Sequence, residues 1–559
     1  MGFKQKDRLA VIETPVGADA FLVVRLEGEE GVSRPYRYEL DLLAEKENLN
    51  FNDLVGQHAL LRLALPDGAE RYVNGVVSRF AQAGSEEGLW AYRLELVPWL
   101  WLLTRRTDCR IFQNLAVPDI VKKVFDELKL MDYELRLDGI YEPWVYCVQY
   151  RETDFAFVSR LLEEEGIHYF FEQTAKGYKL ILSDNSSQNP VCPEVSKFKY
   201  DAAASGNLPQ DVINRWRVEQ TLQPGRYALN DFNFLDPSTS LLVGLGSAVK
   251  TGADDKLEVF DYPGAYVKLG DETSGKLDKG EARLKLRQQE GDAQARVITG
   301  GGGCRTLTAG HRFVLSEHFH PDFAGQGFLL TAVRHHLRQG PPSSQGTPVL
   351  ASYENEFVCT PQGVPYRPPR ATPRPRVAGP QTAIVVGPEG EEIYTDMHGR
   401  VKVQFHWDRR GKHDEESSCW VRVAQGLAGK EWGLIFHPRI GQEVVVDFLE
   451  GDPDQPLITG RVYNAEQPIP YAPNTQSGVK TRSTKEGGPA NFNEIRFEDE
   501  KGKEELHIHA EKNETIVVEN NKTEQVGVNE TITIGKDRVE TVGENETLTV
   551  GGNRTRTVA

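Results

Sequence analysis

The chain lacks a long apolar segment and an export signal of the common kind. In 559 residues no apolar run approaches the roughly twenty residues that a transmembrane helix needs. The N-terminal stretch MGFKQKDRLAVIETPVGADAF has neither an apolar core nor a small-residue cleavage site. These absences predict a chain without a membrane span and without a Sec-type signal peptide.

Paired cysteines are missing as well. The six cysteines are scattered with no C-x-x-C spacing: Cys109, Cys147, Cys192, Cys304, Cys359 and Cys419. Such spacing is not typical of a disulfide framework or of a structural zinc site. We therefore expect free, buried thiols in a reducing cytosol.

Sequence signatures of catalysis are absent too. H-E-x-x-H does not occur, and the glycines at 300–303 lack the spacing and the lysine of a phosphate-binding loop. Five histidines gather between residues 311 and 336: His311, His318, His320, His335 and His336. Without an acidic partner at helical spacing they indicate loop or interface positions, and a metal site is the alternative. We expect no catalytic residue, no cofactor and no metal.

Positive charge is in the minority. The formal net charge is −17, which argues against nucleic acid as a partner. Arg367, Arg370, Arg374 and Arg376 form a small basic cluster that we expect not to change this. Glu163–Glu165 is expected to be a solvated helix end, because adjacent like charges do not converge on a substrate. Trp99, Trp101 and Trp144 are expected in the core or in an interface.

What the chain has instead is a repeat of eight residues from Asn513 onward. The octads read NETIVVEN, NKTEQVGV, NETITIGK, DRVETVGE, NETLTVGG and NRTRTVA. The sixth position is always branched and apolar: Val518, Val526, Ile534, Val542, Val550 and Val558. The seventh is glycine in the middle four octads: Gly527, Gly535, Gly543 and Gly551. A fixed period marks stacked structural units, and the many Thr, Val and Ile favour strands.

One octad cannot bury its own apolar side chain, so the repeat predicts an oligomer. Eight residues of strand span roughly 26 Å at about 3.3 Å per residue, which fits one face of a prism built from several intertwined chains. We predict a trimer with the sixth-position side chains on the axis and a kink at each glycine, which tolerates positive φ. The second octad position alternates between Glu and Lys or Arg, which we interpret as fixing the register of the stack.

The rest of the chain is predicted to be a region of mixed strands and helices followed by a small β domain. Strands are expected at 21–28, 58–65 and 92–97, helices at 118–130 and 152–166, a hairpin at 167–184 and a loop at 298–305. Five strand-like runs between 400 and 464 fit a small Greek-key barrel of the OB type. The predicted division is 1–370, a Pro-rich linker at 371–380, the barrel at 381–463, a linker at 464–476 and the repeat region at 477–559.

Three segments carry a resemblance to a known family. They are YRETDFAFVSRLLEEEGIHYFFE at 150–172, the stretch from HGRVKVQFHW to VYNAEQP at 398–468, and NEIRFEDEKGKEELHIHAEKNET at 493–515. With the octads that follow, this order of motifs resembles the VgrG family, the trimeric spike proteins of type VI secretion. The resemblance implies a mainly β fold with some α: a phage-hub-like domain with β-barrels and helices, an OB barrel, and an intertwined triple-stranded β-helix.

The same resemblance implies the partners and the place of action. It implies a homotrimer on a hexameric Hcp-type tube, a PAAR-type tip protein, baseplate components, effectors with their adaptors, and transient contact with a target membrane. The protein would be cytoplasmic until assembly and firing, and then secreted. Two alternatives stay open: the hub-spike of a related prophage tail, or a spike whose toxin domain lies beyond Ala559. The sequence stops inside an octad, so either the helix is short or more chain follows. His507 and His509 share one face of a strand, and an ion bound by them on the trimer axis is a further alternative to packed or solvated histidines.

Overall fold

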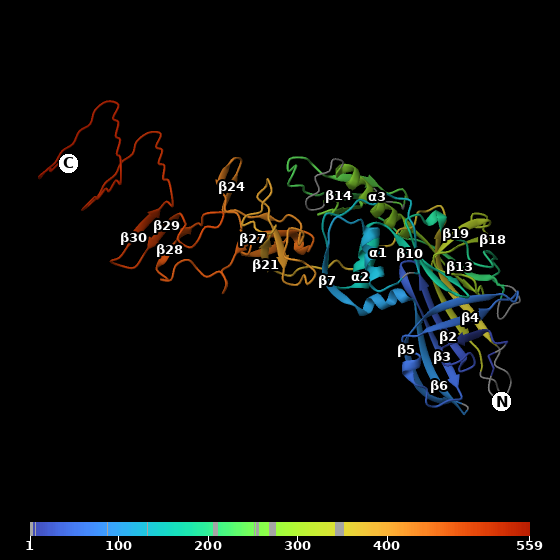
Figure 1. The fold of residues 1–559 in the computed structure, drawn as a ribbon. Helices are drawn as coiled ribbons and strands as arrows, with labels where there is room; N and C mark the ends of the chain where they lie inside the picture. The colour runs from blue at the N-terminus through green and yellow to red at the C-terminus, as the bar shows by residue number, and fades with distance from the viewer. Residues whose placement is uncertain are drawn as a thin grey trace. The chain divides into compact units, whose positions relative to one another are not determined.

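Strands make up most of the regular structure of the chain (Figure 1). The computed structural model describes residues 4–558 except 6, 87, 131, 205–210, 251, 253–255, 268–275 and 341–350. The chain divides into two units, residues 1–468 and 469–559.

A twelve-stranded sheet dominates the first unit. Its main path runs β1 (Ala10–Glu13), β4 (His58–Ala64), β5 (Glu70–Glu86), β6 (Leu89–Val97), β3 (Arg34–Ala44), β2 (Leu22–Gly31), β19 (Gln326–Arg338), β20 (Ser352–Pro361), β17 (Arg296–Gly302) and β13 (Ile213–Gln220). Off this path, β18 (Arg312–Glu317) pairs with β19 and with β12 (Lys197–Lys199). The join between β2 and β19 brings residues about three hundred positions apart into register, Leu26 opposite Leu337. The three strands expected early in the sequence are confirmed as β2, β4 and β6.

Two short helices pack beside this sheet, as the sequence predicts. Helix α1 (Val117–Glu127) starts with Pro118 in its first turn and buries Ile120, Val121, Val124 and Phe125. Helix α2 (Asp154–Glu164) is capped by Thr153, whose hydroxyl accepts a hydrogen bond of 3.1 Å from the amide of Ala156. Gly166 follows with φ of 68°, a left-handed conformation that favours glycine.

Smaller sheets complete this region. The expected hairpin is confirmed as β10 (His168–Thr174) and β11 (Gly177–Ser183), which also pairs with β8 (Tyr133–Arg136). The other elements are β7 (Thr107–Phe112) with β9 (Cys147–Thr153), β14 (Arg226–Leu229) with β15 (Val243–Gly246) and β16 (Glu258–Asp261), α3 (Lys276–Ala295), and 3₁₀ helices at Phe51–Asp53, Trp99–Arg105 and Ser186–Gln188. Among the described residues no helix is long and apolar enough to span a membrane.

The glycine run at 298–305 is not a loop, so that expectation was wrong. Residues 296–302 form β17, an interior strand between β13 and β20. A Cβ on Gly300 would lie 2.2 Å from the ring of Phe357 on β20, so glycine is needed for the close approach of the two strands. The glycine-rich composition suggested a loop, but the glycines are explained by the close packing of β17 against β20.

Residues 381–461 form the OB-type sheet. Its order is β22 (Lys402–Phe405), β21 (Gln381–Val386), β26 (Glu443–Phe448), β27 (Pro456–Arg461) and β23 (Arg422–Val423), with a 3₁₀ helix at Leu449–Gly451. Sequence reasoning missed β21, which follows the Pro-rich segment directly. It also placed a barrel strand at 433–438, but β24 (Leu427–Gly429) and β25 (Trp432–Leu434) form a separate two-stranded hairpin. The core of the domain is a set of valines with Phe405 and Phe448.

The second unit begins with one three-stranded antiparallel sheet. Strand β28 (Gln476–Lys480) pairs with β29 (Glu494–Glu498), which pairs with β30 (Glu505–His509). The chain then continues without helix or strand through the described residues to 558 (Figure 1).

Candidate trimerisation surface

The octad region has an extended backbone with no backbone partner in its own chain. Between 513 and 558 the structure contains no strand pairing and no backbone-to-backbone hydrogen bond. The chain bends at 519–520, 527–528, 535–536, 543–544 and 551–552, so the bends recur every eight residues. Extended segments with unpaired N–H and C=O groups are templates for pairing with another chain.

Apolar side chains in this region are exposed to different degrees. The sixth-position residues Val526, Ile534 and Val550 are 48%, 51% and 43% exposed. Val528 and Val539, at other octad positions, are each 90% exposed. Five of the six sixth-position side chains therefore lie on the more sheltered side of the ribbon, although half of their surface stays uncovered. Val558, in the last octad, is 78% exposed.

The repeat glycines lie at the bends, but not for the reason that the sequence suggested. Gly527, Gly535, Gly543 and Gly551 do not adopt the left-handed region of φ, so the expected use of positive φ was wrong. No atom within 4 Å would meet a Cβ at any of them inside the single chain. Neither backbone conformation nor contacts within one chain account for these glycines.

Charged octad positions form ion pairs within an octad. Lys522 lies 3.0 Å from Glu524, and Arg538 lies 3.2 Å from Glu540. Each pair joins the second and fourth octad positions, and all four side chains are well exposed. Exposed pairs of this kind contribute about 0–1 kcal/mol, so they do not replace a core.

The sheet before the octads has two sharply different faces. Strand pairing places Val479, Ile495 and Ile508 in one row and Phe497 opposite Leu506 in the next, all on the same face. Each of these five side chains is 45–60% exposed. A three-stranded sheet with a bare apolar face needs a cover, and the described part of this unit supplies none.

The opposite face is polar and contains both histidines. Glu494 is almost fully buried there among Lys480, Arg496 and His507, whose nitrogens lie 3.8–3.9 Å from its carboxylate. His507 stacks on His509 with ring centroids 6.4 Å apart. The histidines therefore point away from the face that needs covering.

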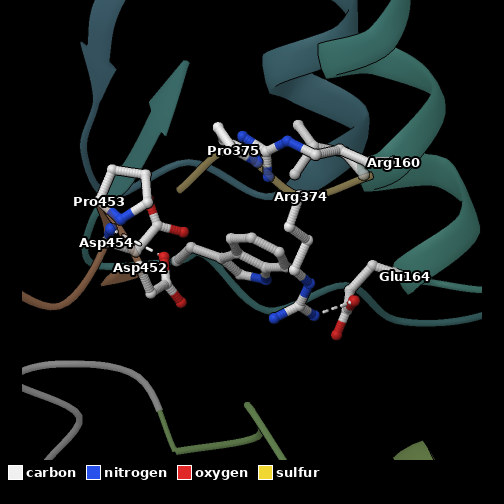
Figure 2. Close-up of a pocket in the computed structure, with 9 residues that line it drawn as sticks. Arg160, Glu164, Arg374, Pro375, Asp452, Pro453 and Asp454 are labelled. Carbon is white, nitrogen blue, oxygen red and sulfur yellow. Dashed lines mark hydrogen bonds and ion pairs between the residues drawn. The ribbon is translucent and has the colours of Figure 1, made fainter. Parts of the chain in front are cut away.

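A second feature, missed by sequence reasoning, is the joint between the hub region and the OB domain. Glu163 and Glu164 were expected to be a solvated helix end, which was wrong. Thr372 of the Pro-rich segment donates hydrogen bonds of 2.7 and 2.9 Å to Glu163, and Arg374 pairs with Glu164. Figure 2 shows Arg374 reaching toward Glu164 from the Pro-rich segment. The cavity beside them is about 20 Å³, room for one water molecule.

The joint continues through a cluster of opposite charges. Arg409 and Arg410 of the OB domain contact Asp108 at 2.9 and 3.1 Å, and Arg410 also contacts Glu127 at 2.7 Å. The amide of Val148 donates a 2.6 Å hydrogen bond to Asp454. The sequence signal was the WDRR motif at 407–410, but its acidic partners lie some three hundred residues earlier.

The five histidines of the hub do not converge. Burial lowers the pKa of His335 to about 4, and its ring contacts the hydroxyl of Tyr353 at 2.6 Å. His311 is buried against Phe170, whereas His318 and His320 lie in the turn between β18 and β19. Among the described residues no three His, Cys, Asp or Glu side chains form a metal-binding group. All six cysteines are free; five are buried, as expected, whereas Cys109 is half-buried. Trp99 and Trp144 are core residues, also as expected.

Comparison with known proteins identifies the chain's relatives. The type VI secretion system spike protein VgrG1b of Pseudomonas aeruginosa is 45% identical over 530 residues, covering 94% of this chain and 70% of the relative. The chain belongs to the VgrG family of type VI secretion spike proteins. VgrG1a of the same organism is 44% identical over 94% of this chain and 80% of the relative.

Three family descriptions match successive parts of this VgrG-family chain. Residues 29–341 match the phage tail baseplate hub (GPD), and residues 382–463 match the type VI secretion system/phage-baseplate injector OB domain. Residues 477–559 match the bacteriophage T4 gp5 C-terminal trimerisation domain. The predicted fold class is thereby confirmed, and the extended octads belong to a trimerisation domain.

Solved structures show the same fold at low sequence identity. The E. coli c3393 protein, a component of the type VI secretion system with structural similarity to the T4 tail proteins gp27 and gp5, matches with a TM-score of 0.58 at 21% identity. That match covers 81% of this chain and 99% of the other. A half-lidded Francisella PdpA-VgrG complex matches with a TM-score of 0.55 at 9% identity, covering 90% of this chain and 88% of the other.

Proposed function

We propose that three copies of this VgrG-family chain wind their octads into one spike that punctures a target envelope. The observation that carries the proposal is the extended octad backbone, which has regular bends, half-exposed apolar side chains and no pairing partner in its own chain. Three intertwined copies would pair these backbones with one another and bury Val518, Val526, Ile534, Val542 and Val550 on the axis.

The three-stranded sheet supports the same assembly. Its apolar face, with Val479, Ile495, Phe497, Leu506 and Ile508, precedes the octads directly and would turn toward the same axis. Full burial of an apolar side chain of this size contributes roughly 1.5–3 kcal/mol, so five per copy form a substantial core. His507 and His509 would then lie on the outer surface, and the proposal includes no axial ion.

The proposal also assigns a role in the assembly to the hub region and to the OB domain. The hub region, to about residue 370, would dock on the hexameric Hcp-type tube, and the OB domain would form the neck. The end of the spike would carry a PAAR-type tip protein. Baseplate components would hold the trimer in the cytoplasm before firing, and firing would release it to the outside. The Francisella relative is complexed with PdpA, which supports binding of further proteins by spikes of this fold.

The proposed role is mechanical and includes no catalytic step. Its support is that the relatives reported above are named spike proteins and that the charged residues of the joint pair with one another. Rigid connection of hub and neck suits a part that transmits a push.

The mass of the purified full chain tests the proposal. Light scattering should give three chains of 62.7 kDa, about 188 kDa. A folded monomer at micromolar concentration would overturn it, since the octads have no apolar cover in one copy. Binding to a purified hexameric Hcp-type protein, measured by co-sedimentation, tests the docking step separately.

A further inference from the structure

The hairpin formed by β24 and β25 has an uncovered apolar surface on the OB domain. Together with Ile435 and Phe436 it makes up residues 427–436, here called the hairpin arm. Leu427, Trp432, Leu434 and Ile435 are 48%, 65%, 53% and 65% exposed. Figure 1 shows β24 standing apart from β21 and β27 of the barrel sheet. A lone two-stranded hairpin is marginally stable in water, so the arm needs a cover.

Strand pairing gathers the large side chains on one face of the arm. Leu427 pairs with Leu434 and Gly429 pairs with Trp432, so these four residues share a face. A Cβ at Gly429 would lie 2.2 Å from the indole of Trp432, so glycine is needed for the ring to lie flat across the hairpin. The arm therefore presents a shaped apolar face, and Lys430 and Glu431 are confined to its turn.

The arm is anchored beside the strand that leaves the domain. The guanidinium of Arg461, the last residue of β27, donates a hydrogen bond to the carbonyl of Phe436. The amide of Phe436 donates to the side chain of Gln425 at 3.1 Å. Only residues 462–476 separate Arg461, which contacts the base of the arm, from residue 477, where the region that matches the trimerisation domain begins. Trimerisation would tether the three OB domains at an effective concentration of the order of millimolar.

We propose that each hairpin arm docks on the OB domain of the next copy in the trimer and closes a ring of three around the neck. The occupant is a second copy because the tail holds it close at all times, whereas an external partner would leave the arm bare between encounters. Contacts of this head-to-tail kind close into a ring under three-fold symmetry. The apolar contact also opposes the repulsion between copies that each have a net charge of −17. This inference rests on the proposed trimer.

Hydroxyl-radical footprinting of the purified full chain tests the arm. If the arm is docked, the oxidation rate of Trp432 should fall at least about tenfold below the intrinsic rate for tryptophan. Ile140, 97% exposed in a hub loop, should react near its intrinsic rate. A second test uses the double variant Trp432→Ser, Leu434→Ser, which should lower the melting temperature of the trimer, whereas Ile140→Ser should not.

The outcomes separate the two proposals. A trimeric mass with Trp432 oxidised at its intrinsic rate would overturn the docked arm and leave the trimer standing. A monomeric mass would overturn both. If the double variant fails to fold, the footprint of the parent protein still decides, because it needs no substitution.

Discussion

Arg374 of the Pro-rich segment forms an ion pair with Glu164, the last residue of helix α2. Arg283 of helix α3 reaches the same carboxylate at 2.9 Å. Glu164 is 4% exposed, so two arginines from distant parts of the sequence balance one buried charge. The Pro-rich segment at 371–380, here called the strap, is therefore fixed to the hub by ion pairs and hydrogen bonds. It leads directly into the OB domain.

Replacing Glu164 by Gln should destabilise the first unit. The substitution removes the carboxylate that pairs with Arg374 and leaves Arg283 with its contact to Glu165 at 3.3 Å. Breaking a buried ion pair costs about 3–5 kcal/mol, and we expect the lower end because Arg374 is 42% exposed. Urea unfolding followed by fluorescence measures the change. The matched control is Glu317→Gln, which breaks the exposed pair with Lys199 and should cost under about 1 kcal/mol. Equal effects of the two substitutions would contradict the role given to the strap.

The joint should weaken in acid. Burial by itself would raise the pKa of Glu127, but hydrogen bonds from Arg410 and Arg106 and the charge of Arg110 outweigh it and lower the pKa to about 2. A carboxyl whose pKa is lower in the folded state stabilises that state above its unfolded pKa, near 4.5, and this contribution is lost as the pH falls toward 2.

Glu127→Gln provides the matching test. The variant lacks this titration, so its unfolding free energy should fall less steeply than that of the parent between pH 5 and roughly pH 3. At pH 7 the variant should be the less stable protein. Urea titrations at several pH values give the slopes, and identical slopes for the two proteins would show that Glu127 does not contribute.

Ile534→Asp should disrupt the trimeric tail while the hub stays folded. In the proposed spike it places three carboxylates together near the axis, and each buried charge costs several kcal/mol. Val539→Asp is the control, because Val539 lies on the exposed side of the ribbon and its carboxylates would face water. Resistance of the tail to protease distinguishes the variants. If both tails are digested alike, Ile534 does not face the axis.

Insertions test the register of the octads. A copy of residues 529–544 placed between Val528 and Asn529 should lengthen the spike and keep the trimer, because it preserves the apolar sixth position and the glycine bends. Inserting only residues 529–532 should damage the helix from that point on, since four residues shift Ile534 and the later valines half an octad out of phase. Mass and protease resistance are the measurements. Equal resistance of the two insertion variants would rule out a registered, axis-packed helix.

The sequence by itself determined the features that repeat or depend on neighbouring residues. The octads with their apolar sixth position predicted an assembly of several chains, since no single copy covers Val526 or Ile534. The stripe of Ile120, Val121 and Val124 predicted helix α1, and the hairpin of β10 and β11 was predicted from local patterns. Local propensity and periodicity depend on residues that are close in the chain, so helices, hairpins and repeats can be predicted from the sequence.

Only the tertiary structure decided the features that depend on distant residues. Gly300 belongs to a strand because Phe357 of the neighbouring strand lies over it. Glu164 is buried because Arg374 of the strap pairs with it. The apolar face of β28, β29 and β30 exists because their register aligns Val479, Ile495 and Ile508 in one row. These are pairings between residues tens to hundreds of positions apart. Because loop closure and packing select them, no short stretch of sequence encodes them.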